Sequence, residues 1–367
     1  MDLLTNQSGV QPGQIAELEI EGLSHIPQLE CYLEVIFTLR EATSWAEAGH
    51  EIAFGQINLV RAHPFQVLKG MESPKDTASG PKYSQTSPQE VEIVASTGTV
   101  WKFNVAHGNL VSCRKAGLPE LIHTSPVMDF YRALTDNDRP QDGVGWLTSR
   151  LHQTKSHVRS VTWSGNDSNV TVIVTSRIAP AVLEWCVDTT FTYTFTNSGL
   201  FIKVAGVPRG ENTPPNFARI GLTLSLNSID RATWFGRGPG ESYCDKKLSQ
   251  RMGNWSAAIE DLYTDYEFPQ ESGNRTDVRW VGFKGPRGEL KAYFGDQEGC
   301  SFSALHYETK DLDDCTHPYE LYKRKKDETI VRLDWAHHGL GTGSCGPKTL
   351  PKYELRSGPF EFEILLV

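Results

Sequence analysis

The chain has 367 residues, of which 38% are hydrophobic and 10% aromatic, so it can bury one large core and a smaller one. Its formal net charge is −9, with acidic and basic residues interspersed, which excludes the basic surface that nucleic acid binding requires. No apolar run approaches the roughly 20 residues that span a bilayer, and the first residues lack the basic and apolar regions of a signal peptide. We therefore expect no membrane association and a cytoplasmic location.

The cysteines predict neither a disulfide framework nor a structural zinc site. There are seven of them, an odd number, and they are widely scattered without a Cys-x-x-Cys pair. No metal site is expected from them.

The N-terminal part predicts an incomplete β-domain. Residues 17–20, 31–39 and 51–59 have strand-like patterns, which gives three strands in residues 1–72. Residues 73–88 are crowded with Pro, Ser, Lys, Thr and Gly, so we expect a linker there. Half a β-sandwich leaves unpaired strand edges, which a partner would have to cover.

The remaining residues, 89–367, predict an all-β domain. Residues 190–196 place threonines on one face and Phe191, Tyr193 and Phe195 on the other, and residues 197–199 predict a hairpin turn. Residues 220–226 and 360–364 alternate in the same way, as in antiparallel sheets packed in pairs. Helical spacing is confined to residues 144–152 and 256–263.

Residues 263–280, YTDYEFPQESGNRTDVRW, are the densest polar stretch of the chain. Arg275, Asp277 and Arg279 alternate, which predicts one face of an extended strand. Such a face is either a buried ladder of opposite charges that satisfies itself or a sugar-binding surface. The residues alone leave both interpretations open.

Two further segments combine glycine with polar side chains. Asp136, Asn137 and Asp138 form either an Asx-rich turn before the helix or part of a loop near a site. Residues 341–346 fit the pattern G-x-G-x-x-G, but Pro347 follows and no helix is expected, so this is not a dinucleotide site.

Five segments together resemble the multi-domain β-galactosidases of glycoside hydrolase family 2, in the same order. They are residues 44–56 (SWAEAGHEIAFGQ), 132–138 (RALTDND), 233–245 (TWFGRGPGESYCD), 263–280 and 333–347 (LDWAHHGLGTGSCGP). The resemblance implies a large antiparallel β-sandwich of the galactose mutarotase-like type (a supersandwich), preceded by part of an immunoglobulin-like β-domain.

The resemblance also implies roles for single residues. The 333–347 loop reaches the active site in this family, and well-studied members carry a tryptophan, on which galactose stacks, near the place where this chain has Cys345. We expect Cys345, Ser344, Asp136, Asn137 and Asp138 to lie at a sugar site, with Trp335 as a substitute platform. Structural roles are expected for a second set: Glu241, Tyr243, Glu271, Arg275, Asp277, Arg279 and His337. The residues themselves indicate that Glu241 and Tyr243 dock against the Arg275/Asp277/Arg279 ladder and that His337 pairs with Asp334.

Catalysis in this family depends on a (β/α)8 barrel that carries two catalytic glutamates and most of the magnesium and sodium ligands. The present sequence shows no alternating strand and helix pattern that would supply such a barrel. We therefore expect no catalytic residue and no cofactor in this chain, and no hydrolysis of galactosides by the chain alone.

Two functions are consistent with the sequence. In the first, the chain is the C-terminal or small-chain part of a lactose-cleaving β-galactosidase and acts with a barrel-bearing chain, with oligomers also possible. In the second, it is a free-standing mutarotase-like protein that binds or epimerises sugars, with Glu241, Glu271 or His337 as acid and base. A third possibility is a truncated gene product without a role of its own.

Overall fold

The computed structural model describes residues 13–15, 30–60, 80–295 and 299–367. The chain divides into two compact units, Met1–His63 and Pro64–Val367. The first unit contains an antiparallel hairpin of β1 (Cys31–Thr38) and β2 (Glu51–Val60). Both strands agree with the predicted ones, whereas the strand predicted over 17–20 lies outside the described residues.

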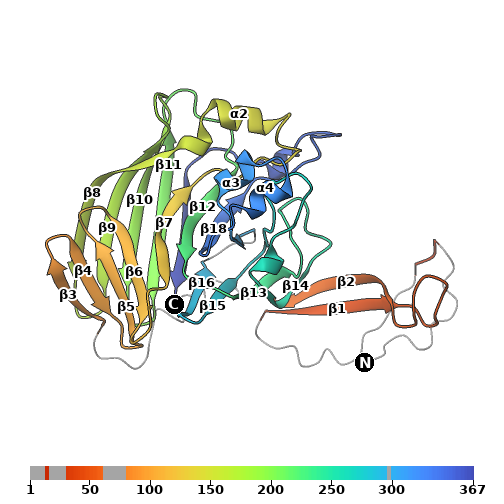
Figure 1. Cartoon of the computed structure of the whole chain (residues 1–367), viewed down its shortest axis with the longest axis horizontal. Coiled ribbons are helices and arrows are strands. Elements are labelled where there is room, and N and C mark those ends of the chain that lie inside the picture. Colours follow the sequence, from red (N-terminus) through yellow and green to blue (C-terminus); the bar gives the residue numbers. More distant parts are fainter. Residues whose placement is uncertain (1–12, 16–29, 61–79, 296–298) are drawn as a thin grey trace. The chain divides into compact units, whose positions relative to one another are not determined.

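The second unit is built from three antiparallel sheets in its described part (Figure 1). A nine-stranded sheet has the order β14-β13-β15-β16-β19-β11-β10-β9-β8, and two four-stranded sheets have the orders β17-β18-β12-β7 and β3-β4-β5-β6. The nine strands are β8 (Lys155–Gly165), β9 (Val170–Ala179), β10 (Cys186–Phe195), β11 (Leu200–Arg209), β13 (Arg231–Gly238), β14 (Arg251–Ala258), β15 (Trp280–Gly285), β16 (Gly288–Phe294) and β19 (Phe360–Leu366). The four-stranded sheets are β7 (Ile122–Asp129), β12 (Arg219–Leu226), β17 (Ser301–Leu305) and β18 (Thr329–His337), and β3 (Lys82–Ser87), β4 (Glu90–Val94), β5 (Thr99–Asn104) and β6 (Asn109–Lys115).

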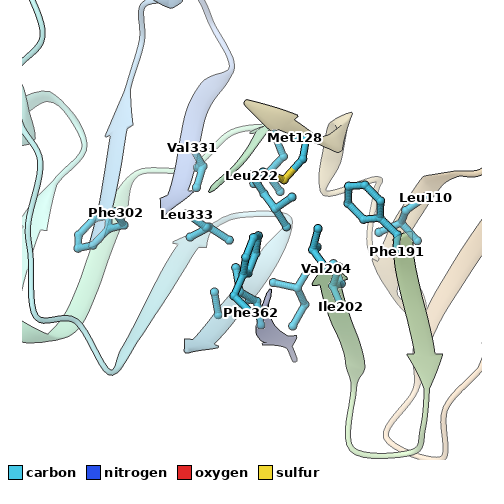
Figure 2. Packing of buried hydrophobic residues seen from close by; sticks show 14 of the residues in the cluster. Leu110, Met128, Phe191, Ile202, Val204, Leu222, Phe302, Val331, Leu333 and Phe362 are labelled. Carbon is cyan, nitrogen blue, oxygen red and sulfur yellow. The ribbon is translucent and has the colours of Figure 1, made fainter. Parts of the chain in front are cut away.

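Both four-stranded sheets pack against one face of the nine-stranded sheet. The ring of Phe103 in β5 lies 4.8 Å from that of Tyr193 in β10. Figure 2 shows Leu222 and Leu333 of the second sheet near Val204 and Phe362 of the nine-stranded sheet. These side chains come from the alternating apolar positions of the sequence, so the predicted all-β, sandwich-forming class is confirmed.

Helices are few and short in the described residues. They are α2 (Asp142–Thr148), α3 (Thr309–Asp314), α4 (Pro318–Tyr322) and the 3₁₀ turns η2 (Leu151–Gln153), η3 (Glu260–Leu262) and η4 (Pro351–Tyr353). The helix predicted over 144–152 is interrupted at Arg150, which has a left-handed backbone with φ of 53°. Within the described residues, no helix combines the length and apolar character needed to cross a bilayer.

Three local predictions need correction. The described end of the predicted linker forms strand β3. Because β3 is an edge strand with mostly exposed side chains, its composition is as polar as that of a linker. Residues 256–258 belong to edge strand β14, not to a helix, because their backbone pairs with β13. Residues 275–279 are not an extended strand: Arg275 forms only an isolated bridge to Phe302, and Asp277 is left-handed with φ of 55°.

The sheet of β7, β12, β17 and β18 has one apolar and one polar face. Leu222 and Leu333 point into the core, and the alternation therefore turns Thr223 and Arg332 to the opposite face. Helix α3 covers part of that polar face, since Thr309 Oγ1 accepts a hydrogen bond of 2.8 Å from Arg332 Nη2.

Candidate functional site

The loop of residues 339–347 follows β18 and is held by side chains from two other segments. Arg132 donates to the carbonyl oxygens of His338 (2.6 Å) and Gly339 (3.1 Å). The carboxylate of Asp245 accepts hydrogen bonds from the backbone N–H groups of Leu340 (3.0 Å) and Gly341 (2.8 Å). Because these contacts fix the backbone where the loop begins, the loop has a defined path without regular secondary structure.

Asn137 fixes the exposed end of the same loop. Its Nδ2 donates to the carbonyl of Gly341 (3.0 Å), and its Oδ1 accepts from both the backbone N–H (3.1 Å) and the hydroxyl (2.7 Å) of Ser344. Cys345 follows with an exposed side chain. The structure thus brings together the predicted residues Asn137, Ser344 and Cys345.

A third segment joins this surface through Asp136. The backbone N–H of Asp136 donates to Gln270 Oε1 at 3.1 Å, and the guanidinium of Arg139 lies 4.6 Å from the ring centroid of Phe268. We call the surface formed by residues 136–139, 268–270 and 339–347 the rim. It presents a carboxylate, a hydroxyl and a thiol to solvent on backbone that is held in place.

Asp138 points away from solvent and shapes the turn that carries the rim. Its carboxylate forms an ion pair of 2.7 Å with the buried Arg132 and also accepts hydrogen bonds from the backbone N–H and the hydroxyl of Thr135. Trp335 is half-buried and packs against the sandwich core, where its ring stacks near Phe360 and Phe362 with centroid distances of 6.3 Å each. Both residues were expected at the sugar site, and both have partners inside the protein.

A layer of buried charges lies on the polar face of the β12–β18 pair. We call this set the polar layer; its members are Arg132, Arg219, Arg332, Glu271 and Asp334. Arg219 donates to Asp334 and, at 3.0 Å, to Asp129. Burial raises the pKa of Asp334 to about 6, against the effect of Arg219. Burial also raises the pKa of Glu271 to about 7, although Arg332 and Arg132 favour its charged form.

His337 does not pair with Asp334 as predicted. Its Nδ1 lies 2.9 Å from Nη1 of Arg132, whereas Asp334 is bound by Arg219. Burial and the charge of Arg132 hold the pKa of His337 well below its usual value, so the ring is neutral near pH 7. The ring of Tyr243 packs against it at a centroid distance of 5.4 Å.

The predicted ladder of Arg275, Asp277 and Arg279 is replaced by separate contacts, because the backbone turns at Asp277. Arg275 donates to the carbonyls of Leu262, Gly273 and Pro239, and burial lowers its pKa to about 10. Asp277 instead forms ion pairs with Arg237 (2.5 Å) and Lys247 (2.9 Å). Arg279 donates to the carbonyl of Asp277 at 3.0 Å.

Glu241 does not dock on a ladder either. Its carboxylate accepts hydrogen bonds from the hydroxyl of Tyr266 and, at 3.0 Å, from the backbone N–H of Gly273. Desolvation would raise the pKa of Glu241, but these hydrogen bonds outweigh it and lower the pKa. The carboxylate therefore stays ionised and holds the turn before Arg275.

Sequence reasoning assigned no role to Arg132, Asp245, Gln270, Arg219 or Arg332. The first three lie inside the quoted motifs. Arg132 and Asp245 could have been found there, because a charged residue far along the chain from a glycine-rich loop can bind that loop's backbone. Arg219 and Arg332 could not be identified from the sequence. Each is a polar residue in an otherwise apolar strand, and such a residue is normally interpreted as facing solvent. No group of three or more metal-ligating side chains occurs in the parts of the chain that the structure describes.

Comparisons with known proteins agree with the resemblance. The family described as "Beta galactosidase small chain" matches residues 95–366, and the one described as "Beta-galactosidase, domain 4" matches residues 3–60. The β-galactosidase of Kluyveromyces lactis is 30% identical over 334 residues, which cover 90% of this chain and 31% of the relative. That of Arthrobacter sp. is 30% identical over 374 residues, covering 95% and 34%. The chain thus spans about a third of the length of these relatives.

Solved structures with a similar arrangement have little sequence in common with this chain. A galactose mutarotase-like protein from Clostridium acetobutylicum is 8% identical, covers 80% of this chain and 99% of its own, and has a TM-score of 0.42. Galactose 1-epimerase from Lactobacillus acidophilus has the same identity and TM-score, with coverages of 79% and 99%.

Proposed function

Because the chain belongs to the β-galactosidase small-chain family, we propose that it forms one wall of the sugar site in a retaining β-galactosidase whose catalytic barrel lies outside this chain. Lactose and other β-D-galactosides are the proposed substrates, and the barrel-bearing portion is the proposed partner. Magnesium and sodium would be bound by that portion. The cytoplasm is the proposed compartment, in keeping with the seven free cysteines.

The rim is the observation that carries this proposal. Asn137 and Asp245 fix a glycine-rich loop from both sides, and the loop presents Ser344 and Cys345 on an exposed surface. Loops fixed in this way on a rigid sheet scaffold are typical of binding surfaces. A wall that is already in place needs little ordering when a sugar or a partner arrives.

The architecture supports a role without catalytic chemistry of its own. Retaining glycosidases need two carboxyl groups about 5 Å apart that face each other across the scissile bond. At the rim, Asp138 is neutralised by Arg132, and the longest described helix, α2, has seven residues, whereas a (β/α)8 barrel needs eight long ones. The acid and base of the mutarotase-like alternative are also engaged: Glu271 and His337 are buried, and Glu241 is held by Tyr266.

The test is complementation. The purified chain, the barrel-bearing portion of a related β-galactosidase, and their mixture are each assayed with a chromogenic β-galactoside and with lactose. We expect turnover by the mixture well above that of either component. Asn137→Ala removes three hydrogen bonds to the loop and should reduce the gain about tenfold, whereas Asn254→Ala, an exposed change on edge strand β14, should leave it unchanged.

Two results would contradict the proposal. Turnover by the isolated chain would show that it has its own catalytic carboxylates. A mixture no more active than the barrel portion alone, with both proteins folded by circular dichroism, would show that the chain adds nothing to the site.

A further inference from the structure

A concave surface separate from the rim lies on the polar face of the sheet of β7, β12 and β18. It is a cleft of about 550 Å³ between these strands, the turn η2 and helix α3. None of its lining residues belongs to the rim. Its size is in the range of small-molecule sites, and most of its lining side chains are polar.

A buried guanidinium in the lining of this cleft has only part of its hydrogen bonds satisfied. Arg332 is 2% exposed; its Nη2 donates to Thr309, but Nε and Nη1 make no hydrogen bond. Tyr131 is 5% exposed, and its hydroxyl lies beside the carboxylate of Asp313, which also lines the cleft. Buried donors are almost always satisfied in folded proteins, so groups of this kind at a cleft indicate a polar occupant.

An acceptor is fixed beside these donors. The carboxylate of Asp129 accepts hydrogen bonds from Arg219 Nη1 (3.0 Å), the hydroxyl of Thr223 (3.0 Å) and the backbone N–H of Tyr131 (3.1 Å). Its side chain remains 26% exposed, and Oδ1 accepts only one of these bonds, so one acceptor position of Oδ1 is still open. The site therefore offers both donors and an acceptor in a rigid arrangement.

The charges of the cleft nearly balance. The carboxylates that line it are Asp129, Glu308, Asp313 and Asp314. Three of them have cationic partners. Asp129 pairs with Arg219, Glu308 with Lys326 (3.4 Å) and Asp314 with Arg324 (3.0 Å). Lys310 and Arg332 add positive charge to the lining. Neither a phosphate nor a polyamine is favoured by such a balance.

The rings of the cleft provide apolar surface for the flat side of a ligand. Tyr131 and His152 lie with centroids 5.5 Å apart at the wall. The aliphatic part of the lining consists of Val127, Met128, Leu151 and Ile330. A molecule with hydroxyl groups on a carbon skeleton matches this mixture, because each hydroxyl both donates and accepts.

We propose that this cleft binds a small neutral polyhydroxylated molecule, a monosaccharide or sugar alcohol, through Arg332, Tyr131 and Asp129. The site lies wholly in this chain and does not depend on the proposed complementation, so either can fail without the other. No reaction is assigned to it.

The test is binding by the full-length chain alone, measured by saturation-transfer NMR and calorimetry with D-galactose, D-glucose and sorbitol. We expect saturable millimolar binding of at least one of them. Tyr131→Phe keeps the ring and removes the hydroxyl beside Asp313, so affinity should fall about fivefold, and thermal unfolding of the variant shows whether the fold persists. Val127→Trp places a bulky ring in the lining of the cleft and should abolish binding, whereas Ile173→Trp, which introduces the same ring at an exposed position of β9, should not.

Three outcomes would overturn the proposal. The first is the absence of saturable binding of all three probes. The second is binding that Tyr131→Phe and Val127→Trp leave unchanged. The third is tighter binding of inorganic phosphate or putrescine than of any polyol, because the cleft would then select charge.

Discussion

Several polar side chains that look chemically useful in the sequence bind backbone in the structure. Arg275 donates to three carbonyl groups, Asp245 accepts from two backbone N–H groups, and Asn137 does both. Irregular segments need such partners, because their backbone groups have no sheet ladder to join. At the scale of single residues, the motifs therefore mark how the loops are held, and the exposed Ser344 and Cys345 are what the loops present.

Cys345 gives the first residue-scale prediction. It is exposed on the rim, so a larger side chain can be accommodated without disturbing the core. We expect Cys345→Trp to restore a flat platform for the sugar and to lower KM in the complemented enzyme severalfold, since a stacked aromatic contributes about 1 kcal/mol. Steady-state kinetics of the mixture with lactose would measure this. Cys345→Leu serves as the control, because it adds apolar volume without a ring; an equal effect of both changes would contradict a stacking role.

Glu271 gives the second residue-scale prediction, on pH. Burial raises its pKa from 4.5 to about 7, so between these pH values the folded state binds more protons than the unfolded state. Stability contributed by this group is then highest below pH 4.5 and falls as pH rises to 7. Glu271→Gln removes this titration. Between pH 4.5 and 7, the decrease in the free energy of unfolding should therefore be about 3 kcal/mol smaller in the variant than in the wild type. Urea unfolding from pH 4.5 to 7.5 tests this; parallel curves for the two proteins would contradict it.

At the scale of elements, the strands were largely predictable and the polar segments between them were not. Phe191, Tyr193 and Phe195 face the core from β10 as their alternation indicates. The edge strands β3 and β14 were missed, because a strand with one neighbour can be polar or small on most positions. The turn at Asp277 was missed because a left-handed aspartate resembles any other aspartate in an alternating pattern.

Two glycines give the element-scale prediction. In β12, a Cβ on Gly221 would lie 2.5 Å from the carbonyl oxygen of Leu333 and 2.7 Å from Cα of Asp334, so Gly221→Ala should destabilise the fold by about 2–3 kcal/mol. In helix α2, a Cβ on Gly145 meets nothing within 4 Å, and Gly145→Ala should stabilise by about 0.5–1 kcal/mol. Thermal unfolding of both variants measures the difference. Equal effects would show that β12 and β18 do not approach as closely as described.

At the scale of the second unit, both candidate sites combine segments that are far apart in the sequence. The rim combines residues near 137, 270 and 344, and the cleft combines residues near 129, 152, 223, 310 and 332. The resemblance predicted that the 136–138 and 339–347 segments lie at one site. The cleft could not be predicted, since its residues are single polar positions on strands whose other positions explain the pattern. Only the antiparallel pairing of β7, β12 and β18 brings them together.

The last prediction concerns the stability of the whole chain in the presence of its proposed partner. A partner that binds only the folded chain stabilises it by about 2.7 kcal/mol at a hundredfold excess over Kd, which corresponds to a rise in Tm of roughly 5 °C. We expect this rise in Tm when the barrel-bearing portion is added. Unfolding of this chain in the mixture is monitored by the fluorescence of a label attached to it. Asn137→Ala should reduce the rise, because the loosened loop must be ordered on binding, whereas Asn254→Ala should match the wild type. An unchanged Tm at saturating partner would mean that the two portions do not associate, and the wall that the rim forms would then have no barrel to face.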